Sequence, residues 1–104
     1  MSADAPLPAV QDAMLDSATL ARLFADLAQG ADVRAILYKS SPEAADAQLV
    51  PRDLADAHQA LLQRSVLGVQ IRYLFQGRQW WDTLLLMPDG VRLVRIEPPG
   101  AQTL

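Results

Sequence analysis

Residues 66–97 read VLGVQIRYLFQGRQWWDTLLLMPDGVRLVRIE, and this segment decides the fold. It contains three runs rich in β-branched, aromatic and aliphatic residues, separated by the short stretches QG and PDG. Glycine adopts the positive φ angles that tight hairpins need, so both separators are typical of turns between antiparallel strands. The segment therefore predicts a β-meander of three strands.

The length of each turn determines which residues of neighbouring strands face each other, and so which side chains share a face of the sheet. A two-residue turn at QG pairs Tyr73 with Trp80, and a three-residue turn at PDG pairs Met87 with Val91. In this register one face is almost continuously apolar, and we expect it to pack on the helices. Its members are Val69, Ile71, Tyr73, Phe75, Trp80, Asp82, Leu84, Leu86, Arg92, Val94 and Ile96.

The two adjacent tryptophans must point to opposite faces, because neighbouring residues of a strand do so. We expect Trp80 to face the helices and Trp81 to face away, across from Arg72, whose guanidinium group can stack on the indole ring. The outward face has aromatic, Met and Arg residues and few acidic ones, a composition typical of protein interfaces. The predicted binding residues are Arg72, Trp81, Leu85, Leu93 and Arg95.

Two helices are predicted before the meander. Residues 17–30 carry apolar side chains at i, i+3, i+4 and i+7, and Gly30 suits the left-handed position just past the helix end. Residues 51–64 begin with a proline, which suits the first helical position. Residues 32–39 are rich in β-formers and predict a further strand. Residues 40–50 fit either a short turn of helix or an acidic loop.

These elements predict a single α+β domain at residues 17–97, in the order α-β-α-β-β-β. Two helices cover one face of a mainly antiparallel four-stranded sheet, and the strand at residues 32–39 lies either at an edge or beside the last strand. Residues 1–16 are expected to form a flexible N-terminal arm and residues 98–104 a flexible tail. A chain of 104 residues suffices for one modest core.

The composition narrows the class of protein. The chain is 51% hydrophobic and 20% charged, as globular proteins are, and it has no cysteine for disulfides, thiol nucleophiles or thiolate zinc sites. A net charge of −3 argues against a nucleic-acid partner. No apolar run approaches the ~20 residues of a membrane-spanning helix, and the N-terminus lacks a signal-peptide pattern. We therefore expect a cytoplasmic protein without membrane contact.

Few residues suggest chemistry. His58 is the only histidine, so we expect no metal site, and no cofactor or nucleophile motif is present. Asp82 falls on the helix-facing side, where a buried carboxylate needs partners such as Tyr73, Arg92 or His58. Such a cluster fits an acid–base site or, as the favoured interpretation, a structural ion pair.

The sequence thus predicts a small accessory or adaptor protein, more plausibly not an enzyme, that binds a protein partner or a second copy through the face around Trp81. Alternatively, the segment 40–50 or the N-terminal arm covers that face. A second hypothesis is a small-ligand sensor or minor enzyme with a pocket between helices and sheet. The residues of that alternative pocket are His58, Tyr73, Asp82 and Arg92.

Overall fold

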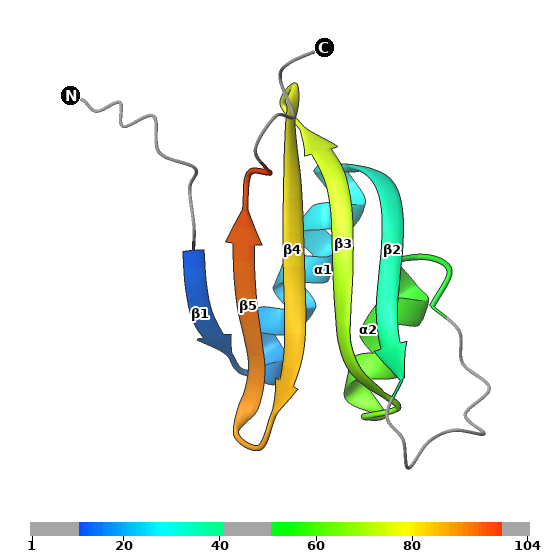
Figure 1. Cartoon of the computed structure of the whole chain (residues 1–104), viewed down its shortest axis with the longest axis vertical. Helices are drawn as coiled ribbons and strands as arrows, with labels where there is room; N and C mark the ends of the chain where they lie inside the picture. The colour runs from blue at the N-terminus through cyan, green and yellow to red at the C-terminus, as the bar shows by residue number, and fades with distance from the viewer. Residues whose placement is uncertain (1–10, 41–50, 99–104) are drawn as a thin grey trace.

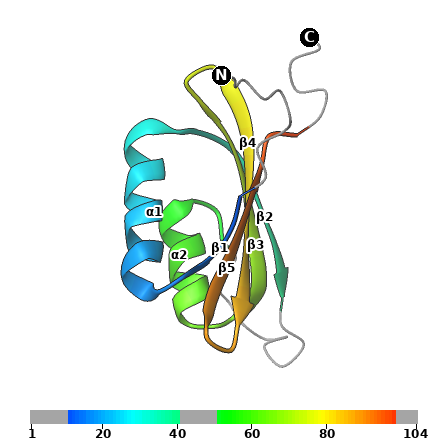
Figure 2. The same ribbon diagram turned by 90° about the vertical axis from the view of Figure 1, so that its left-hand side faces the viewer.

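The structure is a computed structural model that describes residues 11–40 and 51–98. Its strands form one antiparallel sheet in the order β1-β5-β4-β3-β2 (Figure 1). Both helices lie on one face of this sheet, and Figure 2 shows the two layers from the side. The predicted α+β class, with two helices and an antiparallel sheet, is confirmed. The elements are β1 (Gln11–Leu15), α1 (Ser17–Gly30), β2 (Asp32–Ser40), α2 (Leu54–Leu62), β3 (Val66–Phe75), β4 (Arg78–Met87) and β5 (Gly90–Ile96).

The sheet has five strands and not the four predicted, because β1 forms within the segment expected to be a flexible arm. β1 pairs with β5, and the element order therefore begins with a strand. Of its five residues only Leu15 is buried, so the segment lacks the alternating pattern that identifies a strand. The rest of the predicted arm, the segment 41–50 and residues 99–104 lie outside the described residues.

Helix α1 matches its predicted range, but its end differs from the prediction. Asp16 caps the N-terminus by accepting a hydrogen bond of 2.8 Å from the backbone N–H of Thr19. Gly30 is the last helical residue rather than a left-handed one, and Ala31 after it is extended. A Cβ at position 30 would lie 3.2 Å from the ring of Phe75, so glycine is favoured here by close packing.

Helix α2 is shorter at both ends than the predicted range of residues 51–64. Asp53 caps it, accepting a hydrogen bond of 2.8 Å from the N–H of Asp56, so Pro51 precedes the helix. At the other end Arg64 has a φ of 56°, which terminates the helical path. Both helices pack on the sheet around a core made of Leu15, Leu20, Phe24, Leu27, Ala57, Ala60, Leu61, Val66, Val69, Ile71, Tyr73, Leu84, Val91 and Leu93.

Strand β2 forms the edge of the sheet beside β3, which is one of the two places left open for it by the sequence. A bulge between Val33 and Ala35 interrupts its pairing with β3. Arg34, at the bulge, forms an ion pair with Asp32 at a nitrogen–oxygen distance of 3.0 Å. Bulges and charged side chains at a sheet edge discourage pairing with a further strand.

The first hairpin of the meander has the predicted register. Gln76 and Gly77 form a two-residue turn with φ angles of 53° and 80°. Two successive positive φ angles give the turn a twist that matches the twist of the strands it joins. The resulting pairs are Phe75 with Arg78, Tyr73 with Trp80, Arg72 with Trp81, Ile71 with Asp82 and Val69 with Leu84.

The predicted register of the second hairpin is wrong by one residue. Met87 pairs with Gly90 and not with Val91, so the turn is only Pro88–Asp89. Gly90 lies inside β5 with a φ of 154°, and a Cβ there would lie 2.8 Å from the backbone oxygen of Leu15 in β1. The absence of a side chain at Gly90 therefore allows β1 to lie close to β5. The shift exchanges the two faces of β5: Val91, Leu93 and Arg95 point to the helices, and Arg92, Val94 and Ile96 point away.

Candidate functional site

We call the face of the sheet turned away from α1 and α2 the outer face. Its side chains form rows that run across the strands, and three of these rows lie at its centre. Among the described residues no helix covers this face, which is turned toward the viewer in Figure 1. The Trp81 row holds Ala35, Arg72, Trp81 and Ile96; the middle row holds Leu37, Gln70, Thr83, Val94 and Asp12; the Leu85 row holds Lys39, Gly68, Leu85, Arg92 and Met14.

Trp81 is the largest side chain of the outer face. The register places it across from Arg72, as the length of the first turn predicts. The guanidinium carbon of Arg72 lies 4.0 Å from the centre of the indole ring, within the range of a cation–π contact. Trp80, the neighbouring residue, lies on the opposite face and packs against the core. The two adjacent tryptophans thus lie on opposite faces of β4.

Polar side chains beside Trp81 are hydrogen-bonded to one another. The Nε of Arg72 donates to the Oε1 of Gln70 at 2.8 Å, and the Nε2 of Gln70 donates to the Oγ1 of Thr83 at 3.0 Å. A polar group that already has a partner costs less free energy to remove from water than one without. These hydrogen bonds therefore lower the free-energy cost of removing the centre of the outer face from water.

The outer face also has a hollow at one end. Gly68, in the Leu85 row, is buried beside Leu85: a Cβ added there would lie 3.0 Å from the Cδ2 of Leu85 and from the backbone oxygen of Leu84. A shallow hollow of about 240 Å³ opens at this end of the face. Its lining includes Leu37, Leu67, Gly68, Gln70, Thr83 and Leu85. Leu37 and Leu67 are exposed at 43% and 41%, so the hollow is bordered by accessible apolar surface.

Arg92 lies on the outer face and not beside Asp82 as the sequence register predicted. Its Nε donates to the Oδ1 of Asp12 at 2.9 Å, which links β5 to the edge strand β1. The hydrogen bond from Arg92 lowers the pKa of Asp12. Because each side chain of this pair neutralises the other, the face keeps only a weak positive charge at Arg72 and Lys39.

Of the five predicted binding residues, the outer face contains three. Arg72, Trp81 and Leu85 lie on it, whereas Leu93 and Arg95 point toward the helices because of the register shift in β5. Val94 and Ile96 occupy the positions expected for Leu93 and Arg95. The face is thus more apolar than the sequence indicated.

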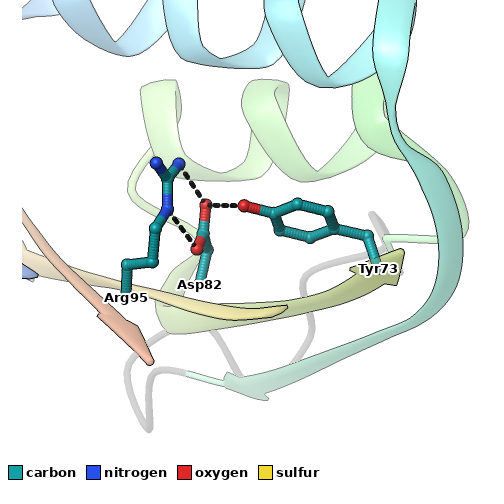
Figure 3. Close-up of polar contacts among 3 residues, drawn as sticks. All are labelled: Tyr73, Asp82 and Arg95. Atoms are coloured by element: carbon teal, nitrogen blue, oxygen red, sulfur yellow. Dashed lines mark hydrogen bonds and ion pairs between the residues drawn. The ribbon is translucent and has the colours of Figure 1, made fainter. Parts of the chain in front are cut away.

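A buried cluster lies on the other side of the sheet. Asp82 is completely buried, and it accepts hydrogen bonds from the Nε and Nη2 of Arg95 at 2.8 and 2.7 Å. The hydroxyl group of Tyr73 donates to the same carboxylate at 3.1 Å. Figure 3 shows the carboxylate between the guanidinium group and the phenol. Of the partners predicted for Asp82, only Tyr73 is present, and Arg95 takes the place of Arg92.

The electrostatics of this cluster favour a structural role. Burial, together with the negative charge of Asp82, raises the pKa of Tyr73 above its usual range. The hydrogen bond to Asp82 raises the pKa of Arg95. The phenol therefore keeps its proton and the guanidinium group its charge at neutral pH, so neither exchanges a proton there. The cluster ties β3, β4 and β5 together as a buried ion pair.

A pocket of about 450 Å³ opens beside Arg95, between α1 and the β3–β4 hairpin. Arg78 lies on its border and forms an ion pair with Glu97 at 3.1 Å. The pocket is not the predicted one: His58 stacks on Phe24 instead, with ring centres 4.7 Å apart and an angle of 9° between the planes. The lining includes Leu23, Leu27, Tyr73, Phe75, Trp80 and Arg95.

Residues 11–40 and 51–98 contain no group of three or more His, Cys, Asp or Glu side chains arranged to hold a metal ion. Neither of the two described helices is long and apolar enough to cross a membrane. Comparison of the chain with protein-family models, curated proteins and solved structures finds no match. The outer face and the pocket beside Arg95 are two candidate functional sites among the described residues.

Proposed function

We propose that this chain is a non-catalytic docking protein that binds another protein surface through its outer face. The observation that carries this proposal is the arrangement around Trp81. The indole ring is stacked by Arg72, and the polar neighbours Gln70 and Thr83 are hydrogen-bonded within the face. Tryptophan and arginine are the residues most enriched among the few that dominate binding energy in protein interfaces.

The dimensions of the outer face support a stable contact. Strands lie ~4.8 Å apart and rise ~3.3 Å per residue, so five strands present a surface of roughly 24 by 30 Å, on the order of 700 Å². A standard protein–protein interface buries about 800 Å² on each partner. The outer face therefore has nearly the area that a specific complex needs.

Photo-crosslinking tests the docking function. A benzoylphenylalanine replaces Leu37, which is an exposed residue of the middle row, in cells that naturally produce the chain. The matched control carries the same group at Ala21, which is exposed on α1. We expect a discrete protein adduct from position 37 that is lost when Trp81→Ala is added, and none from position 21. The absence of an adduct at position 37 would contradict the proposal.

A second candidate function is the binding of a small ligand in the pocket beside Arg95. Its volume of about 450 Å³ falls within the range of ~300–1,000 Å³ usual for ligand sites. Trp80 and Phe75 offer apolar walls, and Arg95 is held in place by Asp82. The N–H groups of Arg95 that Asp82 does not use suit a carboxylate.

The two tryptophans distinguish the candidates in one experiment. Titration with a panel of aromatic carboxylates is followed by the NMR signals of the two indole N–H groups. A shift confined to Trp80 supports the ligand pocket, because Trp80 lines it and Trp81 does not. No saturable shift of Trp80 with any member of the panel counts against it.

A further inference from the structure

We infer that the partner of the outer face is a second copy of this chain, related to the first by a twofold axis that runs along the middle row. This inference rests on the proposed docking function and specifies its partner. A rotation of 180° about that axis keeps the position along each row and exchanges the Trp81 row with the Leu85 row. Trp81 of one copy then lies over Leu85 of the other, and Arg72 lies over Gly68 of the other.

The rotation brings the stacked Arg72 and Trp81 side chains of one copy over the end of the face that carries a hollow in the other. In the Trp81 row the guanidinium group of Arg72 and the indole ring of Trp81 stack on each other. The Leu85 row borders a hollow of about 240 Å³, whose lining includes Leu37, Gly68 and Leu85. That hollow is smaller than the ~300–1,000 Å³ of usual ligand pockets, but it suits one large side chain. After the rotation Arg72 of one copy, stacked on Trp81, lies over Gly68 at the hollow of the other, and this contact occurs twice in the pair.

The charges are compatible with a second copy as well. Arg92 is neutralised by Asp12, so Arg72 is the main cation near the centre of the face. After the rotation the two Arg72 side chains lie two rows apart, at least ~13 Å along the strands. That separation exceeds the Debye length of ~8 Å at physiological salt, so their repulsion is weak. A face with so little net charge also offers little to attract a strongly acidic partner.

The area is sufficient for a dimer. Two faces on the order of 700 Å² each bury about 1,400 Å² in total, within the ~1,200–2,000 Å² of stable specific complexes. Two sheets that pack face to face lie ~10 Å apart with their strands nearly aligned, as in β-sandwiches. The outer face of one copy would become the covering layer of the other.

The first test is the mass of the full chain in solution, measured by sedimentation equilibrium at micromolar concentrations. We expect twice the 11.4 kDa of one chain. Leu85→Glu and Trp81→Ala should each weaken the dimer at least tenfold in the dissociation constant. The control Leu62→Glu, at an exposed position of α2, should leave it unchanged.

Engineered cysteines test the position of the axis, and the natural absence of cysteine makes them unambiguous. Thr83→Cys lies on the axis, so a short bismaleimide, which can span two sheets ~10 Å apart, should join two copies efficiently. Ala35→Cys lies in the Trp81 row, ~13 Å or more from its own counterpart, and should react at least several-fold more slowly. Equal yields at the two positions would overturn the proposed axis.

The outcomes separate this inference from the docking function. A monomer at all concentrations overturns the second copy as partner, whereas a different protein crosslinked at Leu37 would still support the docking function. A dimer that survives both Trp81→Ala and Leu85→Glu forms through another surface and overturns the inference. A monomer with no crosslink at Leu37 overturns both proposals.

Discussion

Replacement of Arg95 by methionine tests the buried ion pair and the strand register together. Methionine keeps an apolar stem but leaves the fully buried carboxylate of Asp82 without its cation. Removal of one partner from a buried ion pair costs ~3–5 kcal/mol. Water reaches the Arg95 side chain, which is 25% exposed, and Tyr73 still donates to the carboxylate. We therefore expect Arg95→Met to lower the free energy of unfolding by about 3 kcal/mol, at the lower end of that range.

The matched control is Arg92→Met, which changes the same residue type in the same strand. Arg92 pairs with Asp12 on the outer face, where the two side chains are 44% and 46% exposed. Exposed ion pairs contribute little to stability, so this variant should lose much less than Arg95→Met. Unfolding in urea, followed by circular dichroism at one fixed protein concentration, measures both losses, because association itself adds apparent stability.

A double variant completes the test. Asp82→Leu combined with Arg95→Met removes both charges, and replacement of a buried ion pair by apolar residues is often neutral or stabilising. We expect the double variant to recover at least about 2 kcal/mol relative to Arg95→Met alone. Equal losses for Arg95→Met and Arg92→Met, or no recovery in the double variant, would refute the buried pair and the register of β5.

Three further expectations follow from individual side chains. Gly90→Ala should lower the free energy of unfolding by about 1–3 kcal/mol, because a Cβ at this position would lie 2.8 Å from the backbone oxygen of Leu15. The amides of β1 should then exchange hydrogen faster, and unchanged exchange would contradict the close approach of β1. Trp80→Ala should lower the free energy of unfolding by about 2–3 kcal/mol, which is less than the loss for a fully buried aromatic residue. Trp81→Ala should lower it by no more than about 1 kcal/mol in dilute, monomeric protein. Equal losses in urea unfolding would reject the assignment of the two tryptophans to opposite faces. Burial raises the pKa of Tyr73 in the folded protein, so its contribution to stability is complete below the unfolded pKa of ~10 and is lost as the pH rises above that value. The urea midpoint of unfolding should therefore fall between about pH 8 and pH 11, and it should fall less in Tyr73→Phe. An identical fall in both proteins would refute the buried phenol.

The sequence was informative where local chemistry and tertiary structure agree. Gln76–Gly77 has the residue type that a two-residue turn requires, so the register of β3 and β4 could be predicted. The register places Trp81 across from Arg72, and this part of the candidate site needed no structure. Helix α1 was equally readable, because its apolar stripe at i, i+3, i+4 and i+7 marks its range.

The sequence-based predictions were wrong where a residue is required by a contact with a segment far away in the sequence. Gly90 looked like a turn residue, but it is required by the approach of Leu15, some 75 positions earlier in the chain (from 90 to 15). That contact depends on β1, whose side chains are mostly exposed and carry no strand pattern. The missed strand and the shifted register are therefore one error, and it exchanged Arg92 with Arg95 in the candidate site.

The bulge in β2 limits how copies of this chain can associate. Arg34 and Asp32 lie at the irregular edge formed by β2, so a strand from another copy is disfavoured from pairing with this edge. Contact through the flat of the sheet, by contrast, is self-limiting, because a twofold pairing consumes the surface that makes it. The proposed twofold pairing would thus give a finite particle rather than an open-ended fibre.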